Sequence, residues 1–126
     1  MSGATVDIKL PWGTSANVAY IRTMRGIALS KTGRLFREHV VTQVEEDGQD
    51  LGLEGKLSVS IELFEPNKRR RDIDNLIKPL LDALEAANVF VNDFQINSLS
   101  ICRAGYKSGG LMKVKIIEDI EPGEET

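Results

Sequence analysis

Two aspartates separated by one residue, Asp72 and Asp74, follow directly on four basic residues in the stretch KRRRDIDNLIKP. Carboxylate oxygens are hard ligands that suit Mg²⁺, which commonly takes a phosphate oxygen as a further ligand. Four adjacent cations would repel a metal ion unless an anion joined the site, and nucleic-acid phosphate is such an anion. These cations are Lys68, Arg69, Arg70 and Arg71. The stretch therefore points to metal-assisted chemistry on a phosphodiester.

A simpler explanation of the same pattern stays open. The two acids could be an N-cap and a first-turn acid at the positive end of a helix dipole, beside a solvated basic loop. The two carboxylates point to the same side only if the backbone that carries them is extended. Pro79 favours a regular helix that begins close to Asn75, or a kink near Pro79, because proline fits a first turn but removes a hydrogen bond farther inside. We therefore expect both carboxylates on an extended lead-in, free to converge.

Two further side chains could complete such a site. A helix from about Asn75 to Asn88 spans roughly 20 Å at ~1.5 Å per residue, and the five residues that follow reach at most ~17 Å. Asp93 can therefore join the pair only if the chain folds back along the helix; otherwise it is a polar turn residue before a strand. Lys78, four residues after Asp74, could pair with that aspartate or stabilise charge on a phosphate during cleavage.

Other catalytic sets are missing from the sequence. His39 is the only histidine, and it lies in an apolar helical pattern that is more typical of a packed or surface side chain than of a base. There is no histidine-and-cysteine metal set, no serine–histidine pair and no glycine-rich phosphate loop. If the protein is an enzyme, it works with carboxylates, a lysine and a metal ion.

The elements that must position these residues indicate an α+β domain. Alternating apolar residues predict strands at 5–10, 56–64, 96–104 and 111–118. Helical spacing predicts helices at 30–47 and about 75–88. The last two strands are expected to form a hairpin through YKSGG, and the irregular stretch before residue 34 is expected to be a functional loop or to contain short strands. We expect one small domain over 1–118, with a mixed sheet of about four strands and two main helices, and an acidic, disordered tail at 119–126.

Charge is distributed unevenly along the chain. The net charge is −3, but the last nine of the 126 residues carry five acids and no base, so the rest has 16 bases against 14 acids, a net of +2. Residues 67–78 hold five bases against two acids, a local +3, and local fields steer ligands more than the global sum. The single Cys102 excludes an intrachain disulfide, and no apolar run approaches the ~18 residues of a membrane span. We expect a cytoplasmic protein with no membrane partner.

Four motifs, in this order, are LPWGTSANVAY, SKTGRLFREHV, RRRDIDNLIKPLLDAL and NDFQI. Together they resemble the RusA family of Holliday-junction resolvases, from about Ile8 to Glu118. The resemblance implies a homodimeric endodeoxyribonuclease of DNA recombination and repair. Such an enzyme binds four-way DNA junctions and, with Mg²⁺ or with Mn²⁺ as its substitute, nicks two opposed strands symmetrically.

On the matching positions, the resemblance makes Asp72, Asp74 and Asp93 the metal-binding carboxylates and Lys78 the essential cation. Contacts to DNA would come from Asn17, Lys68, Arg69, Arg70 and Arg71. The chain departs from the family pattern at Asn92, where an acid often precedes the third aspartate.

Two other functions stay open. One is a related metal nuclease that acts on forks, flaps or RNA, and the other is a non-catalytic DNA-binding module that uses only the basic loop. A two-fold dimer would place two identical sites against the paired strands of a junction. Phe90 and Phe94 are candidates for the dimer surface, and Lys78 could act in its own subunit's site or in the partner's.

Overall fold

The computed structural model describes residues 2–119 of the chain. In chain order the elements are β1 (Ser2–Leu10), α1 (Ala16–Ala19), β2 (Tyr20–Thr23), β3 (Gly26–Leu29), α2 (Lys31–Glu46), β4 (Lys56–Glu65), η1 (Ile73–Leu76), α3 (Ile77–Ala86), η2 (Asp93–Gln95), β5 (Ile96–Tyr106) and β6 (Leu111–Asp119). The elements η1 and η2 are short 3₁₀ turns. No helix in this described range is long and apolar enough to cross a membrane.

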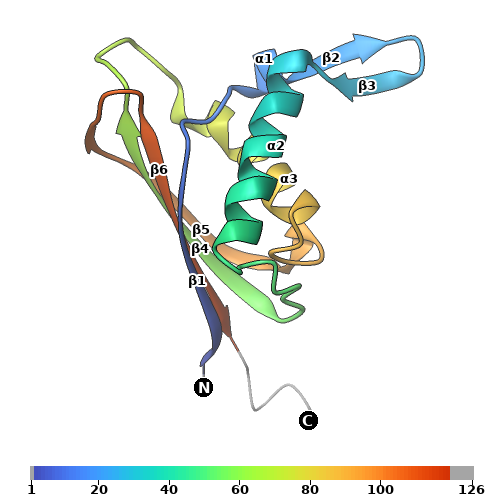
Figure 1. Cartoon of the computed structure of the whole chain (residues 1–126), viewed down its shortest axis with the longest axis vertical. Helices are drawn as coiled ribbons and strands as arrows, with labels where there is room; N and C mark the ends of the chain where they lie inside the picture. Colours follow the sequence, from blue (N-terminus) through green and yellow to red (C-terminus); the bar gives the residue numbers. More distant parts are fainter. Residues whose placement is uncertain (1, 120–126) are drawn as a thin grey trace.

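A four-stranded sheet in the order β1-β6-β4-β5 forms one layer of the domain (Figure 1). Strand β6 is antiparallel to both of its neighbours, whereas β4 and β5 are parallel. Parallel neighbours need a crossover connection, and α3 supplies it. The predicted α+β domain, with its mixed sheet and two main helices, is confirmed.

The predicted hairpin between the last two strands is wrong, because β4 lies between β5 and β6. The connection at residues 107–110 crosses the end of β4, where the Lys107 N–H donates to the Glu65 carbonyl at 2.9 Å. Gly109 and Gly110 both have positive φ, so the glycines do shape this turn. Alternation in a sequence records which face of a strand is buried, but it does not identify the neighbouring strand.

The core lies between one face of this sheet and the two main helices. Every second residue of β4 is buried, namely Leu57, Val59, Ile61 and Leu63. The same cluster takes in apolar residues of α2 and α3, among them Phe36, Val40, Val44, Leu80 and Leu84. The alternate residues of β4, such as Ser60 and Glu62, are exposed on the open face of the sheet.

The irregular stretch before α2 contains two short paired strands, as predicted. Strands β2 and β3 form a separate antiparallel sheet that projects from the body (Figure 1). Helix α2 begins beside its base, capped by the Ser30 hydroxyl, which accepts from the Gly33 N–H at 3.0 Å. A Cβ at position 33 would lie 2.3 Å from the Ala19 carbonyl oxygen, so only glycine allows this close approach.

Strand β6 extends to Asp119, so the first acid of the predicted tail belongs to the sheet. The Glu118 carboxylate accepts from the Gly55 N–H at 2.9 Å. The rest of that tail, residues 120–126, lies outside the described residues.

Candidate active site at the start of helix α3

The first two candidate aspartates lie where the chain leaves β4 and enters α3. Asp72 is extended, with φ −92° and ψ 113°, and precedes η1, whereas Asp74 lies inside that 3₁₀ turn. The expectation of an extended lead-in therefore holds for Asp72 but not for Asp74. Pro79 is the third residue of α3, where its missing N–H costs no hydrogen bond. Both aspartate side chains are exposed, so they are free to bind a ligand from solvent.

The arginine loop, residues 66–72, is braced by its own last arginine. The Arg71 guanidinium donates to the carbonyls of Asn67 and Arg69 at 3.2 and 3.1 Å and to the Asn67 side chain at 2.9 Å. It also lies 5.6 Å from the centroid of the Trp12 ring. Arg71 thus faces inward, while Lys68, Arg69 and Arg70 are exposed.

A buried carboxylate anchors this arginine. Glu65, the last residue of β4, is 5% exposed and lies 3.4 Å from Arg71 and 3.1 Å from Arg103. Arg103 also donates to the Arg71 carbonyl. Two guanidinium partners offset the cost of burying a carboxylate. Sequence reasoning missed Glu65, although the alternation that buries Leu57 to Leu63 also places position 65 on the buried face.

A small polar hollow of about 320 Å³ lies between the arginine loop and the segment that precedes α1. Its lining includes Trp12, Thr14, Ser15, Arg70, Asp72 and Asn75. Helix α1, which carries the exposed Asn17, lies against η1. Hydroxyl, amide and guanidinium donors beside a carboxylate suit a phosphate group that shares a cation with that carboxylate.

Lys78 is held on the neighbouring face of α3. Its ammonium lies 3.3 Å from the Asp82 carboxylate and 5.8 Å from the Tyr20 ring centroid, and the Tyr20 hydroxyl donates to the same carboxylate. Lys78 therefore pairs with Asp82, one turn farther along the helix, and not with Asp74 as the sequence had allowed. Burial and, after it, the hydrogen bond to Asp82 raise the pKa of the Tyr20 phenol. The phenol therefore stays protonated as a donor at neutral pH.

Asp93 lies near the start of β4, whereas Asp72 follows its end. It begins η2, where its N–H donates to the Glu85 carboxylate at 2.9 Å, and β5 then starts opposite Leu57. Asp72 follows the opposite end of β4, eight residues farther along, which is roughly 26 Å at ~3.3 Å per residue. The chain does not fold back along α3. Within residues 2–119, no three potential metal-ligating side chains come together.

The family model described as Endodeoxyribonuclease RusA matches residues 11–117. The chain belongs to the RusA family. Relatives named crossover junction endodeoxyribonuclease RusA, from Shigella sonnei and Escherichia coli, are each 32% identical over 114 residues, which is 90% of this chain and 95% of the relative. The protein of that name from Enterobacteria phage 82 shows the same identity and coverage. The resemblance found in the sequence is confirmed.

The position at which this RusA-family chain departs from the family pattern has a local structural role. Asn92 caps η2, accepting from the Phe94 N–H at 3.0 Å, while the Gln95 side chain accepts from the Asn92 N–H at 2.7 Å. This reciprocal pair is a capping box. Asn92 therefore orients the turn that carries Asp93.

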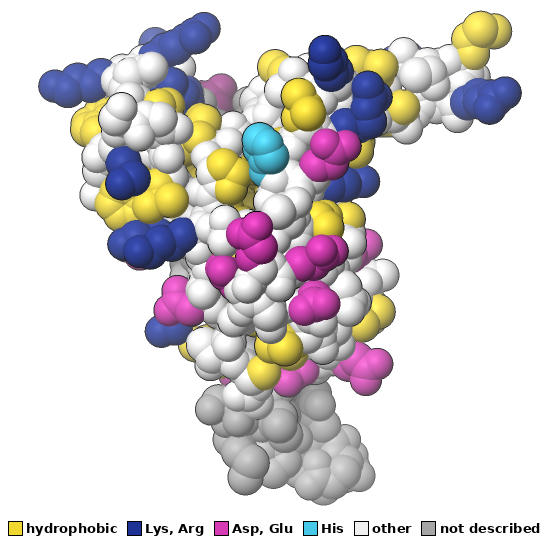
Figure 2. Space-filling view, in the orientation of Figure 1, with side chains coloured by type: hydrophobic (Ala, Val, Ile, Leu, Met, Phe, Trp, Pro, Cys, Tyr) yellow, Lys and Arg dark blue, Asp and Glu magenta, His cyan; other side chains and the backbone are white. Residues whose placement is uncertain are grey.

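The basic surface of this RusA-family chain extends beyond the arginine loop. Between Asp7 and Glu38 there is no acid, but there are six bases, namely Lys9, Arg22, Arg25, Lys31, Arg34 and Arg37. Figure 2 shows Lys and Arg gathered on the two projections at one end, with Asp and Glu concentrated on the body. The absence of acids from this range is the signal in the sequence that predicts the patch.

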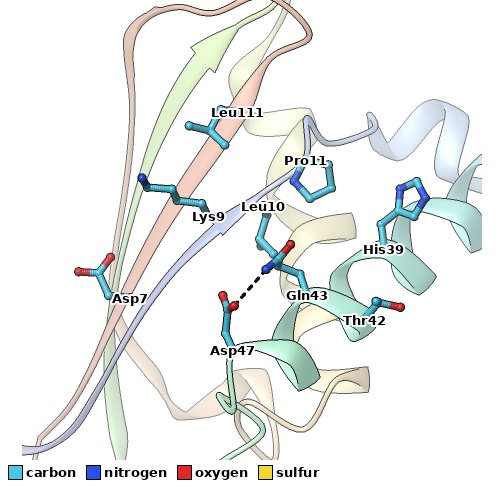
Figure 3. A pocket seen from close by; sticks show the side chains of 9 residues that line it. All are labelled: Asp7, Lys9, Leu10, Pro11, His39, Thr42, Gln43, Asp47 and Leu111. Carbon is cyan, nitrogen blue, oxygen red and sulfur yellow. Dashed lines mark hydrogen bonds between the residues drawn. The ribbon is translucent and has the colours of Figure 1, made fainter.

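A groove larger than the polar hollow beside Asp72 lies away from the aspartates. It measures about 960 Å³ and is lined by residues of β1 and α2, among them Lys9, His39, Gln43 and Asp47 (Figure 3). Gln43 donates to Asp47 at 3.1 Å. His39 is exposed there, as expected for a surface side chain. Size alone does not make this groove the active site, because Asp72 and Asp74 do not line it.

Proposed function

We propose that this chain is a metal-dependent endodeoxyribonuclease that resolves four-way DNA junctions by paired nicks. One observation carries the proposal: a RusA-family chain presents two exposed carboxylates, Asp72 and Asp74, and Asp72 lines a polar hollow at the foot of a braced arginine loop. The relatives that cover nearly the whole chain are named crossover junction endodeoxyribonucleases.

The metal would be held by Asp72, Asp74 and Asp93. Three carboxylates form a hard, anionic oxygen donor set that fits Mg²⁺, with Mn²⁺ as a substitute. The metal ion would position a water molecule, lower its pKa and polarise the phosphate. The exposed Lys68, Arg69, Arg70 and Asn17 would bind the DNA backbone. Lys78, oriented by Asp82 and Tyr20, would stabilise the negative charge that builds on the phosphate oxygens.

Because Asp93 lies far from the other two acids in one chain, we propose that a two-fold dimer completes each site. The outer edge of β5 is unpaired in the four-stranded sheet. Antiparallel pairing of two β5 edges would bring the start of one strand beside the end of the other. The end of β5 adjoins the arginine loop through Arg103, so the partner's Asp93 would approach Asp72.

Exposed apolar side chains support this edge as the contact. Val91, Phe94 and Leu99 are 55%, 81% and 40% exposed, and all three lie on or just before β5. Large exposed apolar groups that cluster on one surface mark an interaction site. Phe90, the other candidate, is excluded because its side chain is wholly buried in the core.

The first test uses a labelled four-way junction and a matched linear duplex, with Mg²⁺ or with EDTA. We expect paired, symmetric nicks in the junction alone, abolished by EDTA and by Asp74→Asn, which should still bind. Asp50→Asn, an exposed acid away from the site, is the matched control and should cut normally. If the protein bound the junction tightly but did not cut it with any metal ion, it would be a non-catalytic DNA-binding module. If forks, flaps or RNA were cut faster than the junction, the protein would be a related metal nuclease with that other substrate.

A mixing experiment tests the shared site. Asp74→Asn and Asp93→Asn should each be inactive alone. If each site takes Asp93 from the partner subunit, a mixed dimer has one site with both substitutions and one site with none, so mixing restores single-strand nicking. If each chain supplies its own Asp93, both sites in the mixed dimer carry a substitution and no activity returns.

A further inference from the structure

The hairpin formed by β2 and β3 projects from the body with a two-residue tip, Met24 and Arg25 (Figure 1, Figure 2). The Thr23 hydroxyl orders this tip, because it donates to the Gly26 carbonyl at 3.0 Å and accepts from the Arg25 N–H at 3.2 Å. Gly26 has φ 118°, which a side chain would strain. The tip is thus a defined turn on a short arm.

This arm exposes apolar side chains where no core can cover them. Met24 is fully exposed, and Ile27 and Ile21 are 75% and 48% exposed. An isolated two-stranded hairpin is marginally stable, so apolar groups at its end do little for the fold. Their position suits contact with a partner.

The charge around these groups indicates which partner. Arg22 and Arg25 flank the apolar residues, and no acid occurs between Asp7 and Glu38. At the base of the hairpin, a groove is lined by Arg34, Arg37, Lys78 and Tyr20, together with residues 27–29. A row of cations from Lys78 to the tip matches a phosphate backbone.

We propose that the β2–β3 hairpin is a wedge that enters branched DNA at the branch point, with Met24 and Ile27 against unstacked bases and Arg22 and Arg25 on the flanking phosphates. The inference rests on the proposed function, which supplies branched DNA as the substrate. Apolar wedges of this kind insert between base steps and kink DNA. Bases at a branch point are already partly unstacked, so the wedge inserts there more easily than into a continuous duplex. It therefore favours branched DNA.

The apolar side chains of the hairpin also lack the groups that read sequence. Methionine and isoleucine side chains offer no hydrogen bonds that match the edges of bases. Met24 and Ile27 therefore contribute preference for a branched structure over a duplex, while they contribute no preference for a particular base.

The test places 2-aminopurine, which brightens when it is unstacked, beside the branch point of a four-way junction, and uses the full chain in EDTA so that no strand is cut. Wild-type protein should raise the fluorescence on the junction and leave a matched duplex unchanged. Met24→Ala combined with Ile27→Ala should abolish the rise, and Met24→Leu should keep it. Leu51→Ala, at an exposed leucine away from the hairpin, is the matched control.

Arg22→Gln combined with Arg25→Gln should reduce the slope of log affinity against log salt by about 2, because each phosphate contact contributes ~0.9. A normal fluorescence rise with the Met24→Ala, Ile27→Ala protein would overturn the wedge. So would conversion of a dimer to a monomer by these changes, which would make the hairpin a subunit arm. Junction cutting by wild-type protein tests the proposed function separately, since the fluorescence readout needs no cutting.

Discussion

The arginine loop and the β2–β3 hairpin are both basic projections at one end of the domain, but they are held in different ways. The loop returns to the sheet, where Arg71 and Arg103 meet the buried Glu65. The hairpin is fixed at its base alone and leaves Met24 uncovered. The difference fits the two tasks proposed above, in which the braced loop would set the position of the reacting phosphate and the uncovered hairpin would adapt to the shape of the DNA.

The largest expected effect is on the aspartates that the braced loop presents. Asp72→Asn should lower the rate of junction cutting by about a thousandfold, since loss of metal assistance removes several kcal/mol of transition-state stabilisation. Junction affinity measured in EDTA should stay close to that of the wild type. An equal loss of affinity and rate would show that Asp72 serves to fold or bind and has no part in the chemistry.

Loss of the brace itself should cost stability and activity together. Glu65→Gln leaves two guanidinium groups without their carboxylate, so the free energy of unfolding should fall by about 2 kcal/mol. This is below the full cost of breaking a buried pair, because Arg103 is half-exposed. Urea unfolding measures the loss. Glu62→Gln, on the open face of the same strand, is the control and should change the unfolding free energy little.

Substitution of Arg70 and of Arg71, which are neighbours in the loop, should affect different properties: DNA binding for the first and cutting for the second. Arg70→Gln should lower the salt slope of junction binding by about 1, because it removes one phosphate contact. Arg71→Gln should leave that slope unchanged and reduce cutting, because the side chain faces Glu65 and Trp12. Titrations at several salt concentrations distinguish the two. Equal slopes for both variants would place Arg71 on the DNA.

The smallest expected effect concerns Tyr20 at the base of the hairpin. Because the folded-state pKa of its phenol is raised, its contribution to stability is present below the unfolded pKa of ~10 and is lost as the pH rises above it. Tyr20→Phe should remove that part of the alkaline loss and cost about 1 kcal/mol at neutral pH. The measurement is the difference in urea unfolding between the two proteins at pH 7 and above pH 10.

Local pattern predicted most of the elements and the identity of the candidate residues. Alternation located β4, and helical spacing located α2 and α3, because burial of one face leaves a periodic record in the sequence. The insertion of β4 between β5 and β6 left no such record, since pairing depends on residues distant along the chain. The inward direction of the Arg71 side chain likewise could not be predicted, because it depends on contacts with Glu65 and with Arg103, which is distant along the chain. Chain length set the greatest distance that Asp93 could reach back toward Asp72, but it did not predict whether the two residues meet.

Strand β6 lies between β1 and β4, although it is the last strand along residues 2–119. During synthesis on a ribosome, β1 therefore has no neighbour in the main sheet until residues 111–119 have emerged. The arginine loop and α3 will have been made well before that moment, but the sheet beneath them is not closed. A chain released before residue 111 would expose Val6, Ile8 and Leu10 to solvent, so truncated products should be degraded or aggregate rather than accumulate as a partly folded nuclease.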